Sequence, residues 1–109
     1  MNDKVARIKA LFCKNSALFS ALGDPTRQQI LLLMADNQHL SVGEITKFTK
    51  LSRPAVSHHL KILKDARLVT QHMEGTRRYY HPAFRAHVQP LRALVDEVAL
   101  LDKTKKGAV

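Results

Sequence analysis

The pattern of apolar and polar positions is clearest between residues 52 and 64, where it predicts an amphipathic helix. Val56, Leu60 and Leu63 recur at helical spacing and so share one face. The pattern therefore predicts a helix that packs one face on a core and offers the other to an anionic partner. Five polar or basic side chains point away from the apolar stripe: Arg53, Ser57, His58, Lys61 and Lys64.

Three further helices are expected before this one. Apolar spacing predicts the first over residues 5–22, with Asn15 as the one gap in the series and with a second apolar edge. A helix that is apolar on two sides packs on two neighbours, here the domain core and a partner chain. Asp24 and Pro25 begin the second helix, which ends near Asn37. Ser41 and Glu44 form a capping box for the third, which reaches Phe48 and turns Ile45 and Phe48 inward.

A β-hairpin and a last helix follow. Residues 68–73 are rich in strand-forming side chains, residues 74–76 supply a turn around Gly75, and residues 77–81 return before Pro82. An apolar stripe from residue 84 to 101, with Pro90 inside it, predicts the last helix. The fold class expected is mainly α with a small β-hairpin wing, in the order α-α-α-α-β-β-α, as a single winged helix-turn-helix domain over residues 1–109.

The amino-acid composition limits the classes of function that the chain can have. The chain of 109 residues carries a formal net charge of +9, which favours a polyanionic partner. The single cysteine, Cys13, excludes an intrachain disulfide framework, and neither a signal peptide nor an apolar run long enough for a membrane span is evident. A cytoplasmic protein without a membrane partner is expected. Because no nucleophile–base set, phosphate-cradling glycine loop or carboxylate pair occurs, we expect no enzyme.

Taken in order, several segments resemble the arsenic-repressor (ArsR-type) family of bacterial winged-helix repressors. The resemblance covers roughly residues 18–82 and is closest to members that lack metal sites. It implies a homodimer that pairs through its first and last helices, binds an inverted repeat in double-stranded DNA and represses transcription, often of its own operon. The segments are Ala21 to Arg27 with Ile30 and Leu31, Ser41 to Ile45, Ser52 to Leu60 with Leu63, and Gly75 to Tyr80.

The resemblance also implies which residues meet DNA. The helix that Ser52 begins would enter the major groove, where an arginine can pair with guanine through two hydrogen bonds. His59 is expected to turn partway to the core, and Glu74 near the wing tip to oppose phosphate. The DNA-binding residues expected are Ser52, Arg53, Pro54, Ser57, His58, Lys61, Lys64, Arg77 and Arg78.

The sequence departs from the family's two common metal sites. Ser41 and Gly43 stand where one site has a Cys-x-Cys pair, and His87 stands without the Asp-x-His pattern of the other. We therefore expect no metal site and no cofactor, and the small-molecule or protein inducer stays open. The alternatives are a winged-helix protein-interaction module, a non-specific DNA-binding protein and a thiol-based redox sensor that uses Cys13, although a small buried role is commoner for a lone cysteine.

Overall fold

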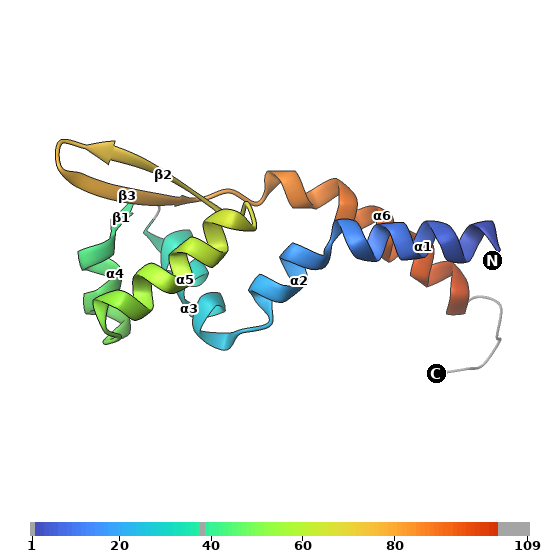
Figure 1. Ribbon diagram of the computed structural model, residues 1–109, viewed down its shortest axis with the longest axis horizontal. Coiled ribbons are helices and arrows are strands. Elements are labelled where there is room, and N and C mark those ends of the chain that lie inside the picture. The colour runs from blue at the N-terminus through green and yellow to red at the C-terminus, as the bar shows by residue number, and fades with distance from the viewer. Residues whose placement is uncertain (1, 38, 103–109) are drawn as a thin grey trace. The chain divides into compact units, whose positions relative to one another are not determined.

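The computed structural model describes residues 2–37 and 39–102, and they fall into two compact units. The first unit, called here the helical pair, is built from α1 (Asp3–Lys14) and α6 (Arg85–Asp102). The second, called here the winged unit, spans Leu18–Phe84. Figure 1 labels the elements along the chain. Among the described residues, none of the helices combines the length and the apolar character that crossing a bilayer requires.

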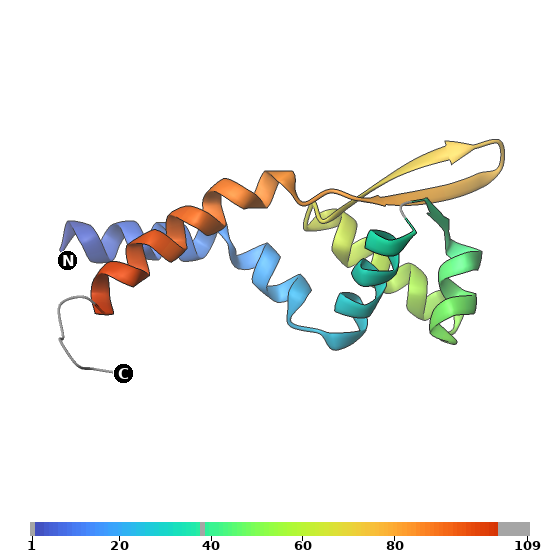
Figure 2. The ribbon, with the colours of Figure 1, turned by 180° about the vertical axis from the view of Figure 1, so that it is seen from behind.

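Four helices and three strands lie in the part of the winged unit that the structure describes. Its helices are α2 (Ser16–Leu22, whose first residues belong to the helical pair), α3 (Pro25–Asp36), α4 (Val42–Thr49) and α5 (Arg53–Asp65). Its strands are β1 (Leu40–Ser41), β2 (Val69–Glu74) and β3 (Arg77–Pro82), which form an antiparallel sheet in the order β1-β3-β2. In Figures 1 and 2 the hairpin tip and α4 lie at the same end of this unit.

The core of the winged unit is apolar and brings together all of its larger elements. Helices α3, α4 and α5 bury their apolar stripes, and Leu40, Val69 and Tyr80 are buried on one face of the sheet. Tyr80 lies opposite Leu40 of β1 and Gln71 of β2. Because strand side chains alternate between faces, the other face of the sheet turns to solvent. The fully buried large side chains include Ile30, Met34, Ile45, Val56, Leu60, Leu63 and Leu68.

The helical pair packs one face of each helix and exposes a second. Ile8 of α1 and Leu94 of α6 are buried, and Arg7 pairs with Glu97 at 3.1 Å. The two-sided character predicted for the first helix is therefore present, and α6 shares it. The exposed apolar side chains on these helices are Val5, Phe12, Val88, Val95, Leu100 and Leu101.

The prediction of one continuous helix over residues 5–22 is wrong, because the chain breaks at Asn15. This residue is fully buried and caps α1. Its side-chain Nδ2 donates to the Leu11 carbonyl at 2.8 Å and to the Pro90 carbonyl of α6 at 3.0 Å. The one polar gap in the apolar series is thus where α1 ends and α2 begins. Helix α6 continues through Pro90.

The sequence-based element order also omits β1. This strand has only two residues, and it forms because β3 offers a free edge to the segment before α4. The predicted hairpin is confirmed, with Gly75 and Thr76 as its turn and Gly75 at φ +62°. The inward placement of Phe48 is wrong, since its side chain is 56% exposed, whereas Ile45 is buried as predicted.

Candidate nucleic-acid interface

A tight link joins α4 to α5 and fixes the helix-turn-helix. Helix α4 ends at Lys50, which takes a left-handed conformation (φ 60°, ψ 19°) while its N–H donates to the Thr46 carbonyl at 2.9 Å. The Ser52 hydroxyl then accepts from the Ala55 N–H at 3.2 Å and begins α5. Only Lys50, Leu51 and Ser52 separate the two helices, so α5 starts at a fixed angle to α4.

Helix α5 divides into a buried and an exposed face as the sequence pattern predicts. Val56, Leu60 and Leu63 are fully buried. His59 lies partway between the faces, with its Nδ1 3.4 Å from an Arg27 nitrogen, as expected for a histidine turned toward the core. Asp65 is exposed, and so are all the residues of this segment that were expected to meet DNA: Ser52, Arg53, Pro54, Ser57, His58, Lys61 and Lys64.

A hollow of about 550 Å³ lies between the start of α4, the start of α5 and the wing. It brings together four of the residues singled out from the sequence, two on α5 and two on β3, which are separated by about twenty positions along the chain. The remaining predicted DNA-binding residues do not line it. The lining residues are Ser41, Val42, Gly43, Glu44, Lys47, Arg53, Ser57, Met73, Thr76, Arg77 and Arg78.

The hollow is electropositive. It holds the cations Lys47, Arg53, Arg77 and Arg78 against the single carboxylate of Glu44. The pKa of Glu44 is lowered, chiefly because the Ser41 N–H donates to it at 3.0 Å and secondarily because of the Ser41 hydroxyl. The Ser41 hydroxyl accepts from the Glu44 N–H at 3.2 Å, which confirms the predicted capping box. The Glu44 charge is thus held mainly by the start of its own helix, with a smaller contribution from the Arg77 charge, and the four cations still outnumber it.

Outside the hollow, the exposed face of α5 is less positively charged, because Asp65 lies beside Lys61. Lys61 pairs with Asp65 at 2.9 Å, one helical turn along. The rings of His58 and His59 lie 5.9 Å apart. Lys47 was not among the predicted site residues, because the sequence marks α4 only as the supporting helix. Its position beside Arg53 becomes evident once α4 and α5 are packed together.

Arg27 supports the helix that carries the interface. Its guanidinium donates to the Ala21 carbonyl at 2.7 Å and the Ser20 carbonyl at 3.1 Å, and it pairs with Asp24 at 3.3 Å. The same group reaches His59 of α5. One side chain thus joins the end of α2, the start of α3 and the inner edge of α5.

Two groups of side chains are candidates for sensing an inducing signal. Cys13 is exposed in this chain, so the buried role that is usual for a lone cysteine does not apply. Among the described residues, His39, His72 and His81 place their ligand atoms within 4.8 Å of one another. The expectation of no metal site rested on other positions and did not consider these three. The hairpin register places His72 and His81 on one face as diagonal neighbours, but His39 precedes the strand that was not predicted.

Comparison with known proteins identifies the family. The profile described as "Bacterial regulatory protein, arsR family" matches residues 24–71, from the N-cap residue of α3 to the middle of β2. An HTH-type transcriptional regulator of Methanocaldococcus jannaschii is 41% identical over 85 residues, which are 78% of this chain and 94% of the relative. The chain belongs to the arsR family. It is therefore a DNA-binding transcriptional regulator with a winged helix-turn-helix fold.

Two other similar proteins agree with this assignment. The transcriptional repressor SdpR of Bacillus subtilis is 40% identical over 63 residues, which are 58% of this chain and 69% of SdpR. A homodimeric winged helix-turn-helix DNA-binding domain from Mycobacterium bovis, described as a possible ArsR-family regulator, superposes with a TM-score of 0.66 at 28% identity, covering 94% of this chain and 92% of that domain.

Proposed function

We propose that this arsR-family regulator is a cytoplasmic homodimeric repressor, without enzymatic activity, that reads an inverted-repeat operator. The observation that carries the proposal is the hollow, where α4, α5 and the wing bring four cations together. Such a surface suits the phosphate backbone, while the exposed first turns of α5 suit the major groove. The similarity to a repressor and to a homodimeric domain supports the rest.

Each predicted residue takes a role in this proposal. Arg53 and Ser57, at the start of α5, contact base edges together with His58, while Arg77 and Arg78 of the wing contact phosphate or the minor groove. Lys47, at the hollow, joins them as a phosphate contact. Ser52, Pro54, Lys61 and Lys64 border the same exposed face of α5 and position it on the backbone. All 109 residues then act as one functional domain in each protomer.

The pairing of two copies is proposed through the helical pair. The second faces of α1 and α6 expose Phe12 at 49% and Val95 at 54%, which is apolar surface that a second copy would bury. In a homodimer the two α5 helices would meet half-sites about 34 Å apart, which is one turn of DNA.

The direct test is fluorescence anisotropy on the DNA upstream of the protein's own gene, with a scrambled duplex alongside, at near-physiological salt and with chelator present. We expect at least ~1000-fold tighter binding to the native fragment. Equal and steeply salt-dependent binding to both duplexes would instead identify a non-specific DNA-binding protein. An absence of binding to either would favour a protein-interaction module or an operator elsewhere.

A variant separates base reading from backbone contact. Arg53→Ala should weaken binding to the native fragment and relax the preference at one base pair by about 1–3 kcal/mol. Lys64→Ala, on the exposed face of the same helix, should weaken binding to every sequence alike and reduce its salt dependence. If Arg53→Ala behaves as Lys64→Ala does, Arg53 contacts phosphate and its proposed role is wrong.

A further inference from the structure

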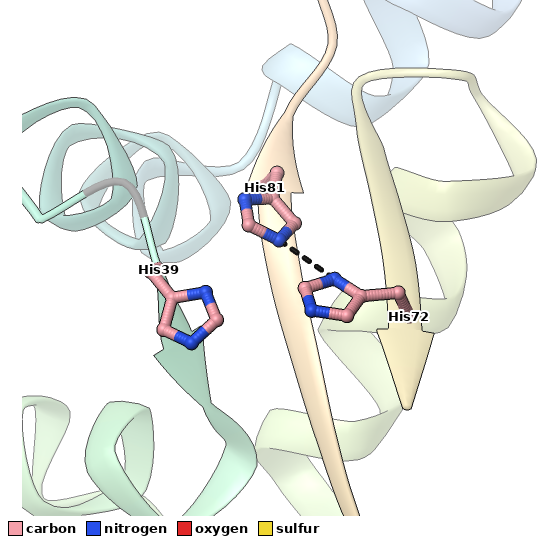
Figure 3. Close-up of side chains that lie close together, drawn as sticks. All are labelled: His39, His72 and His81. Atoms are coloured by element: carbon pink, nitrogen blue, oxygen red, sulfur yellow. Dashed lines mark hydrogen bonds between the residues drawn. The ribbon is translucent and has the colours of Figure 1, made fainter. Parts of the chain in front are cut away.

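The solvent face of the wing sheet carries a cluster of histidines, and we propose that His39, His72 and His81 bind one divalent transition-metal ion while Glu74 positions His72. The three rings come from the segment before β1, from β2 and from β3, and they lie around a common space in Figure 3. The site is distinct from the interface proposed for DNA, and metal binding there requires no DNA.

Strand register explains why these side chains meet. His72 lies opposite Tyr79, and His81 lies two residues farther along β3 on the same face. Ser41 of β1 is also opposite Tyr79, so His39, two residues before it, reaches the same face from the other edge. The His39 ring stacks on Tyr79 at a centroid distance of 4.1 Å. This stacking contact with Tyr79 holds the His39 ring in place.

The distances suit a small ion. His81 Nε2 lies 2.8 Å from His72 Nδ1, and all three ligand atoms lie within 4.8 Å of one another. Imidazole nitrogens bind zinc at about 2.0–2.1 Å, so two such ligands in a tetrahedral site lie about 3.3 Å apart. His39 and His72 are exposed, and their rings can make this small adjustment without disturbing the core.

Glu74 gives His72 the tautomer that a metal ligand needs. The Glu74 carboxylate lies 2.6 Å from His72 Nε2 and 3.3 Å from His39 Nε2. An ionised glutamate carboxylate carries no proton and can only accept hydrogen bonds. The His72 Nε2 atom must then carry the proton, which leaves the Nδ1 lone pair facing His81. A carboxylate that orients a ligating histidine in this way is a common support of metal sites.

The ligand chemistry selects the class of ion. Three neutral imidazoles without a thiolate suit Zn²⁺, Co²⁺, Ni²⁺ or Cu²⁺, whereas Ca²⁺ and Mg²⁺ prefer oxygen ligands. With three protein ligands, a water molecule would complete a tetrahedral site. The ion would tie the segment before β1 to both strands of the wing, so all three strands of the sheet would be joined at one point.

The test is titration of untagged protein with ZnCl₂ by isothermal calorimetry, in a chelator-free buffer near neutral pH. We expect one ion per chain. Each of His39→Asn, His72→Asn and His81→Asn should weaken binding at least tenfold, and Glu74→Gln should weaken it about 10–100-fold. His87→Asn removes a histidine of α6 and should leave the affinity unchanged. Far-UV circular dichroism of each variant checks that the fold is retained.

A second measurement locates the ion without any substitution. Paramagnetic Co²⁺ added to ¹⁵N-labelled protein should broaden the amide signals near residues 72 and 81 before those around His87 of α6. The proposal is overturned if no saturable binding is detected, if His87→Asn loses as much affinity as His72→Asn, or if the signals of α6 broaden first. None of these results would affect the DNA-binding proposal, which is tested with chelator present.

Discussion

At the scale of single residues, Arg27 shows how much the orientation of α5 depends on one side chain. Its guanidinium holds two carbonyls of α2, the Asp24 carboxylate and the His59 ring together, and its side chain is only 13% exposed. No alkyl or ammonium side chain offers donors in so many directions. Arg27 therefore stabilises the interface without facing it.

Arg27→Ala should lower the free energy of unfolding by about 2–3 kcal/mol, because charged hydrogen bonds are lost and the part-buried Ala21 carbonyl loses a donor. Arg27→Lys should recover only part of this loss, since an ammonium cannot form the same fork. Urea denaturation followed by circular dichroism measures both variants. Equal stability of Arg27→Lys and the original protein would show that charge, not geometry, is what matters.

Asp24 makes stability depend on pH. Its pKa is lowered, chiefly by the Thr26 N–H and also by the Arg27 charge. Since the folded-state pKa lies below the unfolded value, the stabilisation is present above pH ~4 and is lost as the pH falls through the folded-state pKa. Asp24→Asn keeps a capping oxygen but cannot ionise. The stability difference between the two proteins, measured by urea denaturation from neutral to acid pH, should shrink below pH ~4. A constant difference would rule out this role.

Local chemistry made many single-residue predictions possible. Asp24, Ser41 and Ser52 cap helices as predicted, because a cap depends on only three or four neighbouring residues. Phe48 was predicted inward from its apolar character, yet its side chain is 56% exposed. Which apolar side chains a short helix buries depends on where its neighbours pack, and the sequence alone does not contain that information.

At the scale of elements, the wing turn depends on one backbone conformation. Gly75 has φ +62°, and a Cβ added there would meet no atom within 4 Å. Strain, not crowding, therefore opposes a side chain at this position. Gly75→Ala should destabilise the protein by about 1–2 kcal/mol, whereas Gly75→Asn should cost less because asparagine tolerates the left-handed region. Thermal unfolding compares the two variants. A larger loss for Gly75→Asn would contradict this explanation.

Helices and strands were predictable where the apolar pattern repeats over many residues. They were less predictable where a contact with a distant part of the chain determines whether the element forms. The α5 stripe and the hairpin follow from the sequence pattern. The break at Asn15 arises because that side chain caps α1 and contacts α6, which is 75 residues away in sequence. Strand β1 exists only because the edge of β3 is free. The candidate metal site was missed for the same reason, since His39 depends on β1 for its place.

At the scale of the whole molecule, the exposed apolar stripes of the helical pair carry the proposed assembly. Phe12→Glu or Val95→Glu should shift the protein from dimer to monomer, because a charge cannot be buried unpaired at an apolar interface. Ala10→Glu adds the same charge to α1 away from that stripe and should leave the dimer intact. Sedimentation velocity at micromolar concentration distinguishes these cases. A monomeric parent protein would contradict the proposed assembly.

The side chains proposed to contact DNA and the apolar faces proposed to pair lie in different units. Half-site affinity and pairing strength can therefore change independently. When one winged unit of a dimer has bound its half-site, the other unit is held close to the second half-site at a high effective concentration. The dimer therefore binds the operator more tightly than either unit binds a half-site alone. Mutations in α1 or α6 would thus change the protein concentration at which dimers form and occupy the operator. The DNA sequence that the protein binds would stay the same.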